Sequence, residues 1–296
     1  MCSLHLPSGP LTCPAWRHSL SATLDPSDPP EATVTAAEAA PIVVEGVSKR
    51  YQTPSGAVTA VEGVSLTVRP GEFVSLLGPS GCGKSTVLLM IGGLVRPDAG
   101  RIVIEGEPSS GPNPKKVALA FQDPGLFPWR TALDNVGFGL ELQGLPAARR
   151  REIALGLLEP MGLKGFEAKF PRELSGGMRQ RVAIARALAL DTPILLMDEP
   201  FGALDEQTRL LMGEWLVGVR RRTRRTIVFV THSLQEAIAL SDRIVVMTAR
   251  PGRVKDVIEV PLPFPRDLGS PEVADLRAKL WGQVREESLR AMESSA

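Results

Sequence analysis

The feature that most constrains this chain is a glycine-rich stretch at residues 78–86, between an apolar run and a helix-like apolar segment. The run at 73–77 has the length and composition of a buried strand, and residues 87–91 continue as a helix. Glycines allow successive backbone N–H groups to point toward one centre and bind phosphate oxygens, and the helix N-terminus carries a partial positive charge. The stretch consists of Gly78, Pro79, Ser80, Gly81, Cys82, Gly83, Lys84, Ser85 and Thr86. This pattern predicts a phosphate-binding loop.

Two side chains of the loop carry groups that a nucleoside triphosphate needs. Lys84 is placed to reach the β- and γ-phosphates, and the hydroxyl of Ser85 can be a ligand of Mg²⁺. The alternative interpretation is a flexible turn. It is disfavoured because the strand before the loop and the helix after it supply the context that the motif requires. We therefore expect a nucleoside triphosphate site, although the loop alone does not say what hydrolysis drives.

Composition excludes some classes of protein. The 296 residues are 43% hydrophobic and 23% charged, which is ordinary for a globular chain, and the net charge of +1 gives no global indication of a nucleic-acid partner. The three cysteines, Cys2, Cys13 and Cys82, are too few for a disulfide framework and favour a reducing compartment. No apolar run approaches the roughly 20 residues needed to span a bilayer. We expect a chain that does not cross a membrane by itself.

The domain organisation follows from shifts in composition. Residues 1–40 contain scattered prolines among Ser, Thr and Ala without a structural period, and they predict a disordered tail rather than a secretory signal. A translation start further downstream would leave the same pattern. We predict one domain over 41–262, with a helical insertion at about 125–173. In this insertion Thr131 can cap a helix through 132–136, and Pro146 suits the first position of a second helix. In the remaining segment, 263–296, an amphipathic helix is expected to pack against the domain. Its apolar stripe is Val273, Leu276, Leu280 and Val284.

A second glycine-rich step, Leu174–Gly177, precedes another apolar helix-like run at 182–188. Ser175, Gly176 and Gly177 would then lie at a helix N-terminus, which is again an anion site by the same dipole argument. One nucleotide does not need two such sites. The second site is explained if it faces a nucleotide bound by another subunit.

Two carboxylates follow the buried-type strand at 193–197. Asp198 and Glu199 stand at its C-terminal end, where open α/β sheets place ligand chemistry. Asp198 can hold Mg²⁺ through its water shell, and Glu199 can polarise a water for attack on the γ-phosphate. The alternative, a solvated acidic turn, fits poorly with a phosphate loop upstream. We expect both carboxylates in the site.

Two further side chains are candidates for nucleotide contacts. The strand at 226–230 ends at His232, and Ser233 with Glu236 predicts a capping box, so His232 would stand beside the same sheet edge and contact the γ-phosphate. A purely structural histidine is the alternative. Tyr51, the only tyrosine, follows the first strand and could stack on a base or simply pack. The basic runs at 149–151 and 220–225 are expected to be solvated faces, with lipid or partner contact as the alternative.

Taken in order, these motifs resemble the nucleotide-binding subunit of an ATP-binding cassette transporter. The resemblance covers roughly residues 42–250 and implies an α/β fold: a P-loop NTPase-type core sheet, an antiparallel β subdomain and an inserted α-helical subdomain. The matching positions are Gly78–Ser85, Gln122, Leu174–Gly177, Asp198, Glu199, Leu204, Asp205 and His232. One such motif is moderately specific, but the full set in this order is highly specific.

The resemblance also implies roles for single residues. Tyr51 would stack on adenine, and Gln122 would sense Mg²⁺ and the attacking water while it links to a membrane partner. Ser175 and Gly177 would close over the γ-phosphate of ATP bound by the opposite subunit. Asp205 would cross the dimer interface. Two copies would thus enclose two ATP molecules, and Glu199, His232 and Gln122 would serve hydrolysis.

A finer resemblance concerns the segments 126–136 and 248–253, which are similar to importers of nitrate, sulfonate and taurine. Such subunits work on the cytoplasmic face of the inner membrane with a permease and, indirectly, an extracytoplasmic solute-binding protein, and not with nucleic acid. The apolar cluster 127–129 would lie near the groove that receives the permease. The alternative is a soluble cassette ATPase of DNA repair or translation. This chain has one phosphate loop and no heptad run, which favours transport.

Overall fold

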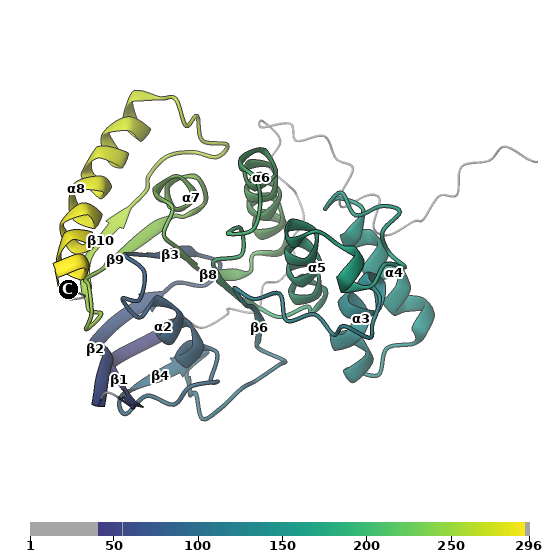
Figure 1. The fold of residues 1–296 in the computed structure, drawn as a ribbon, viewed down its shortest axis with the longest axis horizontal. Coiled ribbons are helices and arrows are strands. Elements are labelled where there is room, and N and C mark those ends of the chain that lie inside the picture. The colour runs from purple at the N-terminus through teal and green to yellow at the C-terminus, as the bar shows by residue number, and fades with distance from the viewer. Residues whose placement is uncertain (1–40, 55, 294–296) are drawn as a thin grey trace, which may run out of the picture. The chain divides into compact units, whose positions relative to one another are not determined.

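The computed structural model describes residues 41–54 and 56–293, and the predicted tail 1–40 lies outside the described residues. This part of the chain is a mixed α/β structure with a four-stranded and a six-stranded sheet (Figure 1). The predicted fold class is therefore confirmed.

The four-stranded sheet is antiparallel and has the strand order β2-β1-β4-β5. Its strands are β1 (Ile42–Thr53), β2 (Gly56–Val68), β4 (Ala99–Ile104) and β5 (Glu107–Pro108). Apolar residues of these strands, such as Val44, Val64 and Ile102, share one buried cluster with Val74 and Val228 of the other sheet. The antiparallel sheet is therefore packed against the core through one apolar face.

The six-stranded sheet has the order β10-β9-β3-β8-β7-β6 and is parallel, except that β10 runs antiparallel to β9. Its strands are β3 (Phe73–Leu77), β6 (Val117–Ala120), β7 (Ile194–Asp198), β8 (Thr226–Thr231), β9 (Arg243–Met247) and β10 (Val254–Glu259). Every residue of β3, β7 and β8 is buried. Continuous burial is expected for parallel strands covered on both faces, and it explains their uninterrupted apolar runs.

The parallel register brings three predicted motifs to one edge of this sheet. Leu77, the last residue of β3, pairs with Thr231 of β8, and Asp198 of β7 pairs with Val230 of β8. The carboxyl ends of the three strands therefore meet. Consequently, the glycine-rich loop after β3, the carboxylates after β7 and His232 after β8 emerge side by side.

Helices surround the sheets: α2 (Lys84–Ile91), α3 (Ala132–Leu142), α4 (Ala147–Leu158), α5 (Gly176–Ala189), α6 (Glu206–Thr223), α7 (Leu234–Leu240) and α8 (Pro271–Glu293), with the 3₁₀ turn η1 (Pro171–Glu173). Figure 1 shows α3 and α4 grouped beside α5, with which both are in contact. Thr131 caps α3 as predicted, its hydroxyl accepting the Asp134 N–H. Pro146, predicted as the first helical residue of α4, is instead its N-cap residue.

The C-terminal helix α8 packs against the domain, as its apolar stripe predicts. Val273, Leu280 and Val284 are buried in a cluster with residues of β9, β10 and α7, and Leu276 is half-buried beside them. Within residues 41–54 and 56–293, no helix is both long enough and apolar enough to span a bilayer.

The prediction that the basic run 220–225 is a solvated face is wrong at two positions. The Arg220 guanidinium donates to both carboxylate oxygens of Asp242 and to the carbonyl of Gly71. Arg225 is buried and donates to Asp191 and to the carbonyl of Leu188. Both arginines fix the C-terminal end of α6 because carbonyls and carboxylates converge there. That convergence involves residues far away in the sequence.

Candidate functional site

The phosphate-binding loop connects β3 to α2, and its backbone needs glycine. Gly81 and Gly83 have φ of 75° and 101°, in the left-handed region that side chains disfavour. A Cβ on Gly83 would lie 2.4 Å from Cγ1 of Val61 and 2.8 Å from the carbonyl oxygen of Ala60. The loop thus combines a turn of positive φ with a close approach to β2, and both require a missing side chain.

Lys84 lies inside this loop and is only 4% exposed. Its Nζ donates to the carbonyls of Gly78 and Pro79, at 2.9 Å each, so the buried ammonium is satisfied by backbone oxygens. Cys82 is also buried, and burial raises the pKa of its thiol despite the nearby ammonium. The thiol is therefore neutral, and Lys84 supplies the positive charge of the loop.

Ser85 and Asp198 meet at the start of α2. The Ser85 hydroxyl donates to Oδ1 of Asp198 at 2.9 Å, across 113 residues of sequence. Burial raises the pKa of Asp198, although the hydrogen bond from Ser85 and the Lys84 charge oppose this. Magnesium is held by one or two protein oxygens together with waters and substrate phosphates. A hydroxyl and a carboxylate side by side next to a phosphate loop fit that requirement.

Glu199 and His232 form a second pair at the same edge. Oε2 of Glu199 lies 3.0 Å from Nδ1 of His232, and the Glu199 side chain is 17% exposed. The backbone of Glu199 has a φ of 43° and is held by a hydrogen bond from its N–H to the Val230 carbonyl. The sequence predicts each residue at this edge separately, and the structure brings them into contact.

The capping box predicted from Ser233 and Glu236 is only half correct. The Ser233 hydroxyl accepts the N–H of Glu236, but the Glu236 carboxylate does not return to the Ser233 N–H. That N–H donates to Oγ1 of Thr231, which in turn donates to Glu236. Arg209 of α6 lies 3.4 Å from the same carboxylate. Glu236 is therefore buried in a polar network behind His232 that the local motif does not reveal.

The second glycine-rich step forms the N-terminus of α5. Ser175 is the N-cap residue, and its hydroxyl accepts the N–H of Met178. Ser175 and Gly176 are exposed, while a Cβ on Gly177 would lie 3.3 Å from the Ala203 carbonyl. The predicted helix N-terminus is thus present and accessible, next to residues 203–204, and anion binding there stays a prediction.

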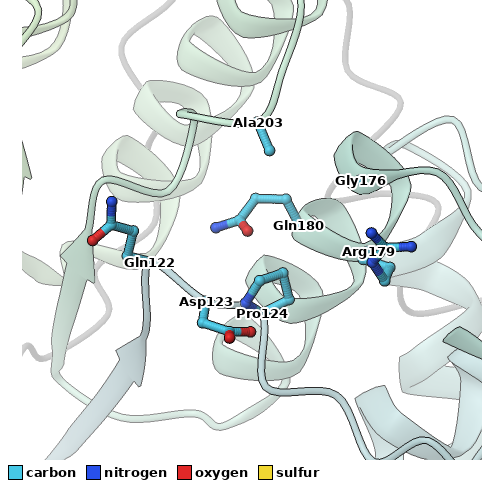
Figure 2. A pocket seen from close by; sticks show the side chains of 7 residues that line it. All are labelled: Gln122, Asp123, Pro124, Gly176, Arg179, Gln180 and Ala203. Carbon is cyan, nitrogen blue, oxygen red and sulfur yellow. The ribbon is translucent and has the colours of Figure 1, made fainter.

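Gln122 lies in a surface pocket of about 430 Å³ that adjoins this helix end. Figure 2 shows it across the pocket from Gly176 and Arg179, with the Gln180 side chain between them. The other lining residues are Asp123, Pro124 and Ala203. The structure therefore brings Gln122 together with the start of α5 and with the segment that precedes Asp205.

Gln180 is a residue that sequence reasoning missed. Its side chain is 1% exposed, its Nε2 lies 3.4 Å from the carbonyl of Phe121, and its Oε1 has no partner. A buried polar group with an unpartnered oxygen is costly and needs a reason. A glutamine on the otherwise apolar face of α5 was the available signal. Gln180 thus links α5 to Phe121, the residue between the end of β6 and Gln122.

The last two predicted site residues are both accessible. Asp205 is exposed and is the N-cap residue of α6: its carboxylate accepts the N–H and the hydroxyl of Thr208. The backbone hydrogen bond from Thr208 holds the pKa of Asp205 below its ordinary value. Tyr51 lies near the end of β1 at 37% exposure, with the Lys49 ammonium 5.8 Å from its ring centroid. An accessible ring beside a cation is suited to stacking on a base.

Known proteins are similar to this chain over most of its length. Residues 61–202 match the family model described as ABC transporter. An uncharacterized ABC transporter ATP-binding protein of Methanocaldococcus jannaschii is 45% identical over 250 residues, which cover 84% of this chain and 93% of that protein. The aliphatic sulfonates import ATP-binding protein SsuB of Bacillus cereus is 43% identical over 242 residues, which cover 82% of this chain and 95% of the relative.

Two solved structures of an ATP-binding cassette are similar to this chain in fold. The dimeric post-hydrolysis structure of the ATP-binding cassette MJ0796, bound to ADP and Pi, superposes with a TM-score of 0.69 at 34% identity. The alignment covers 74% of this chain and 98% of that one. A second dimeric structure of MJ0796, a bacterial ABC transporter cassette, superposes with a TM-score of 0.70 at 35% identity.

Proposed function

The chain belongs to the ABC transporter family of ATP-binding proteins, and on that premise we propose that it is the ATP-hydrolysing subunit of an importer. It is an ABC ATPase cassette. The proposal concerns what its hydrolysis drives: uptake of a small nitrate-, sulfonate- or taurine-like solute through a separate permease. The observation that carries the hydrolytic part is the meeting of the Ser85–Asp198 and Glu199–His232 pairs beside the phosphate loop.

Each of the predicted site residues has a separate role in the proposed hydrolysis. Lys84 and the backbone of the phosphate loop bind the β- and γ-phosphates, and Tyr51 stacks on the base. Ser85 and Asp198 would hold Mg²⁺, with Gln122 completing its surroundings, and the ion would neutralise charge on the phosphates. Glu199 accepts a proton from the attacking water, and His232, 3.0 Å from Glu199, donates to the γ-phosphate.

The second half of each site comes from a second copy of the chain. The accessible start of α5, with Ser175, Gly176 and Gly177, offers N–H groups and the positive helix end to the γ-phosphate bound by the partner. Asp205 lies at the same surface and would cross the interface. Dimeric structures of the related MJ0796 cassette support this arrangement.

The permease would dock beside the apolar cluster 127–129. Phe127 packs on Phe138 of α3 with ring centroids 4.5 Å apart, and the Arg130 guanidinium lies over both rings, so Phe127 is held against α3. Trp129 is 71% exposed and available to a partner. The name of the sulfonate-importing relative supports the solute class. The subunit would then work as a peripheral protein on the cytoplasmic face of the inner membrane, with a solute-binding protein acting outside.

Removing the proposed base tests the hydrolytic mechanism. Glu199→Gln keeps the shape of the side chain and its hydrogen-bonding capacity but cannot take the proton. We expect normal ATP binding, turnover lowered by about 10²–10⁴-fold, and a dimer that persists with ATP in size-exclusion chromatography. Glu214→Gln, which removes an exposed carboxylate from α6, is the matched control. A variant that stays monomeric with ATP and turns over at the wild-type rate would contradict the proposal.

A further inference from the structure

The loop between β9 and β10, residues 248–253, contacts the phosphate loop from outside. Arg250 Nε and one of its terminal nitrogens lie 3.2 and 3.1 Å from the carbonyl oxygen of Gly81, so the guanidinium donates to that carbonyl through two N–H groups. Gly81 has a φ of 75°. A peptide in this unusual conformation is therefore held in place by a charge-assisted contact, and such hydrogen bonds are roughly twice as strong as neutral ones.

Gly252 brings the same loop into close packing with the phosphate loop. A Cβ at this position would lie 1.9 Å from the carbonyl oxygen of Cys82. The Gly252 N–H donates to the Ala60 carbonyl at 2.9 Å, and its own carbonyl accepts the N–H of Glu62 at 3.0 Å. The β9–β10 loop is thus fixed to β2 on one side and pressed against the phosphate loop on the other.

A buried carboxylate of the C-terminal helix α8 holds the loop from behind. Glu287 is 1% exposed, and its Oε2 accepts the N–H of Ala249 at 2.9 Å. Its Oε1 accepts from Lys255 at 2.7 Å and from Arg290 at 3.1 Å. Both oxygens of Glu287 are therefore engaged, and one of them is bonded to the residue that directly precedes Arg250.

We propose that Arg250 is a positioning residue for the phosphate loop, and that Glu287 makes helix α8 part of the same support. The chain of contacts runs from α8 through Glu287 and Ala249 to Arg250 and Gly81. Arg250 does not need to touch the nucleotide; it holds the backbone that does. The affinity for ATP then depends on how α8 packs against the β9–β10 loop. This inference rests on the proposed function of the 78–86 loop as the ATP site.

The test compares Arg250→Ala with two other variants of the same loop region. Loss of a charged hydrogen bond that orders the loop is expected to raise KM for ATP about 5- to 10-fold, with kcat within about twofold. Arg250→Lys restores much of the affinity because an ammonium can still donate to Gly81. Arg253→Ala is the matched control: it removes a cation from the same loop, but that cation pairs with Glu62 on the surface.

The α8 arm of the test uses Glu287. Glu287→Ala is expected to raise KM in the same direction, and combining it with Arg250→Ala should add little because both act on one chain of contacts. Thermal melting without nucleotide shows whether each variant folds. If Glu287→Ala does not fold, the Arg250 variants test the role of Arg250 and Glu287→Gln tests that of α8. Glu287→Gln keeps an oxygen acceptor for the Ala249 N–H and so provides a milder second variant.

The outcomes separate this inference from the proposed function. If wild-type protein and Arg250→Ala bind a non-hydrolysable ATP analogue equally well, the inference is overturned and the proposed ATP site stands. An equal loss of affinity in Arg253→Ala would also overturn it, because the effect would then be general to the loop. Wild-type protein that does not bind the analogue would overturn the proposed ATP site and the inference with it.

Discussion

Glu199 has a left-handed backbone conformation at the end of β7, with a φ of 43°. For a residue with a side chain, such a conformation costs about 1–3 kcal/mol and persists only when its surroundings enforce it. Here the Val230 carbonyl and His232 hold the peptide and the carboxylate. A residue held in this way at the carboxyl edge of a parallel sheet suits the proposed role of catalytic base, because the contact with His232 fixes the direction of its carboxylate.

A comparison of Gly83 with Gly46 tests why single residues of the phosphate loop must be glycine. Both have positive φ, but a Cβ at Gly83 would collide with Val61 while a Cβ at Gly46 meets nothing within 4 Å. We expect Gly83→Ala to lower the free energy of unfolding by about 1–3 kcal/mol more than Gly46→Ala, and to weaken ATP binding as well. Urea unfolding and nucleotide titration measure both effects. Equal destabilisation by the two substitutions would show that backbone conformation, not packing, sets the requirement.

At the scale of elements, local patterns predicted the sheet edge but not the contacts between distant elements. The strand-loop-helix motif at 73–91 and the cap at Thr131 were predicted because each depends on neighbours in the sequence. The Arg250–Gly81 contact spans 169 residues and exists because β9 pairs with β3. Nothing local indicates that pairing. The local sequence predicts a solvated face for Arg220 and Arg225, and this is wrong for the same reason: their partners lie on other elements.

The domain boundaries and the roles of the site residues stay predictions. What the sequence could provide for the site was the set of chemical groups. What it could not provide was their pairing, such as Glu199 with His232, or the buried support given by Glu236 and Gln180. Such support depends on which helix packs behind which strand. That arrangement is decided by the whole apolar core rather than by any local motif.

Helix α8 gives a prediction about pH. Burial by itself raises the pKa of Glu287, but hydrogen bonds from Lys255 and the Ala249 N–H outweigh it, and the resulting pKa lies below the ordinary 4.5. Because the folded-state pKa is lower than the unfolded one, the ionised carboxylate stabilises the fold above pH 4.5, and this stabilisation is lost as the pH falls through the folded-state pKa. Wild type should therefore exceed Glu287→Gln in unfolding free energy at neutral pH, and the difference should shrink as the pH is lowered below 4.5.

Chemical denaturation at a series of pH values measures this difference, with Glu214→Gln as the control for removing an exposed carboxylate. A wild-type advantage that is unchanged between neutral and acidic pH would contradict the assignment of Glu287 as a charged, paired group.

At the scale of the whole molecule, the proposed function gives one chain two complementary halves of an ATP site. In that proposal the phosphate loop with Lys84 binds the nucleotide, and the accessible N-terminus of α5 at Ser175 is a second anion site. If the second half acts on a partner's nucleotide, ATP binding brings two copies together and does mechanical work on an attached permease. The central claim is therefore that each active site is shared between two chains.

Mixing two inactive variants tests this claim most directly. Lys84→Ala disables the phosphate loop. Gly176→Asp places a negative charge at the start of α5, where an acidic residue favours the helix but would repel a γ-phosphate. The substitution fits there, because a Cβ would meet only the Arg179 guanidinium, at 3.9 Å. A mixed dimer regains one intact site, so equal amounts of the two variants should recover about a quarter of the wild-type ATPase activity. Activity that does not exceed the sum of the separate variants would contradict the account.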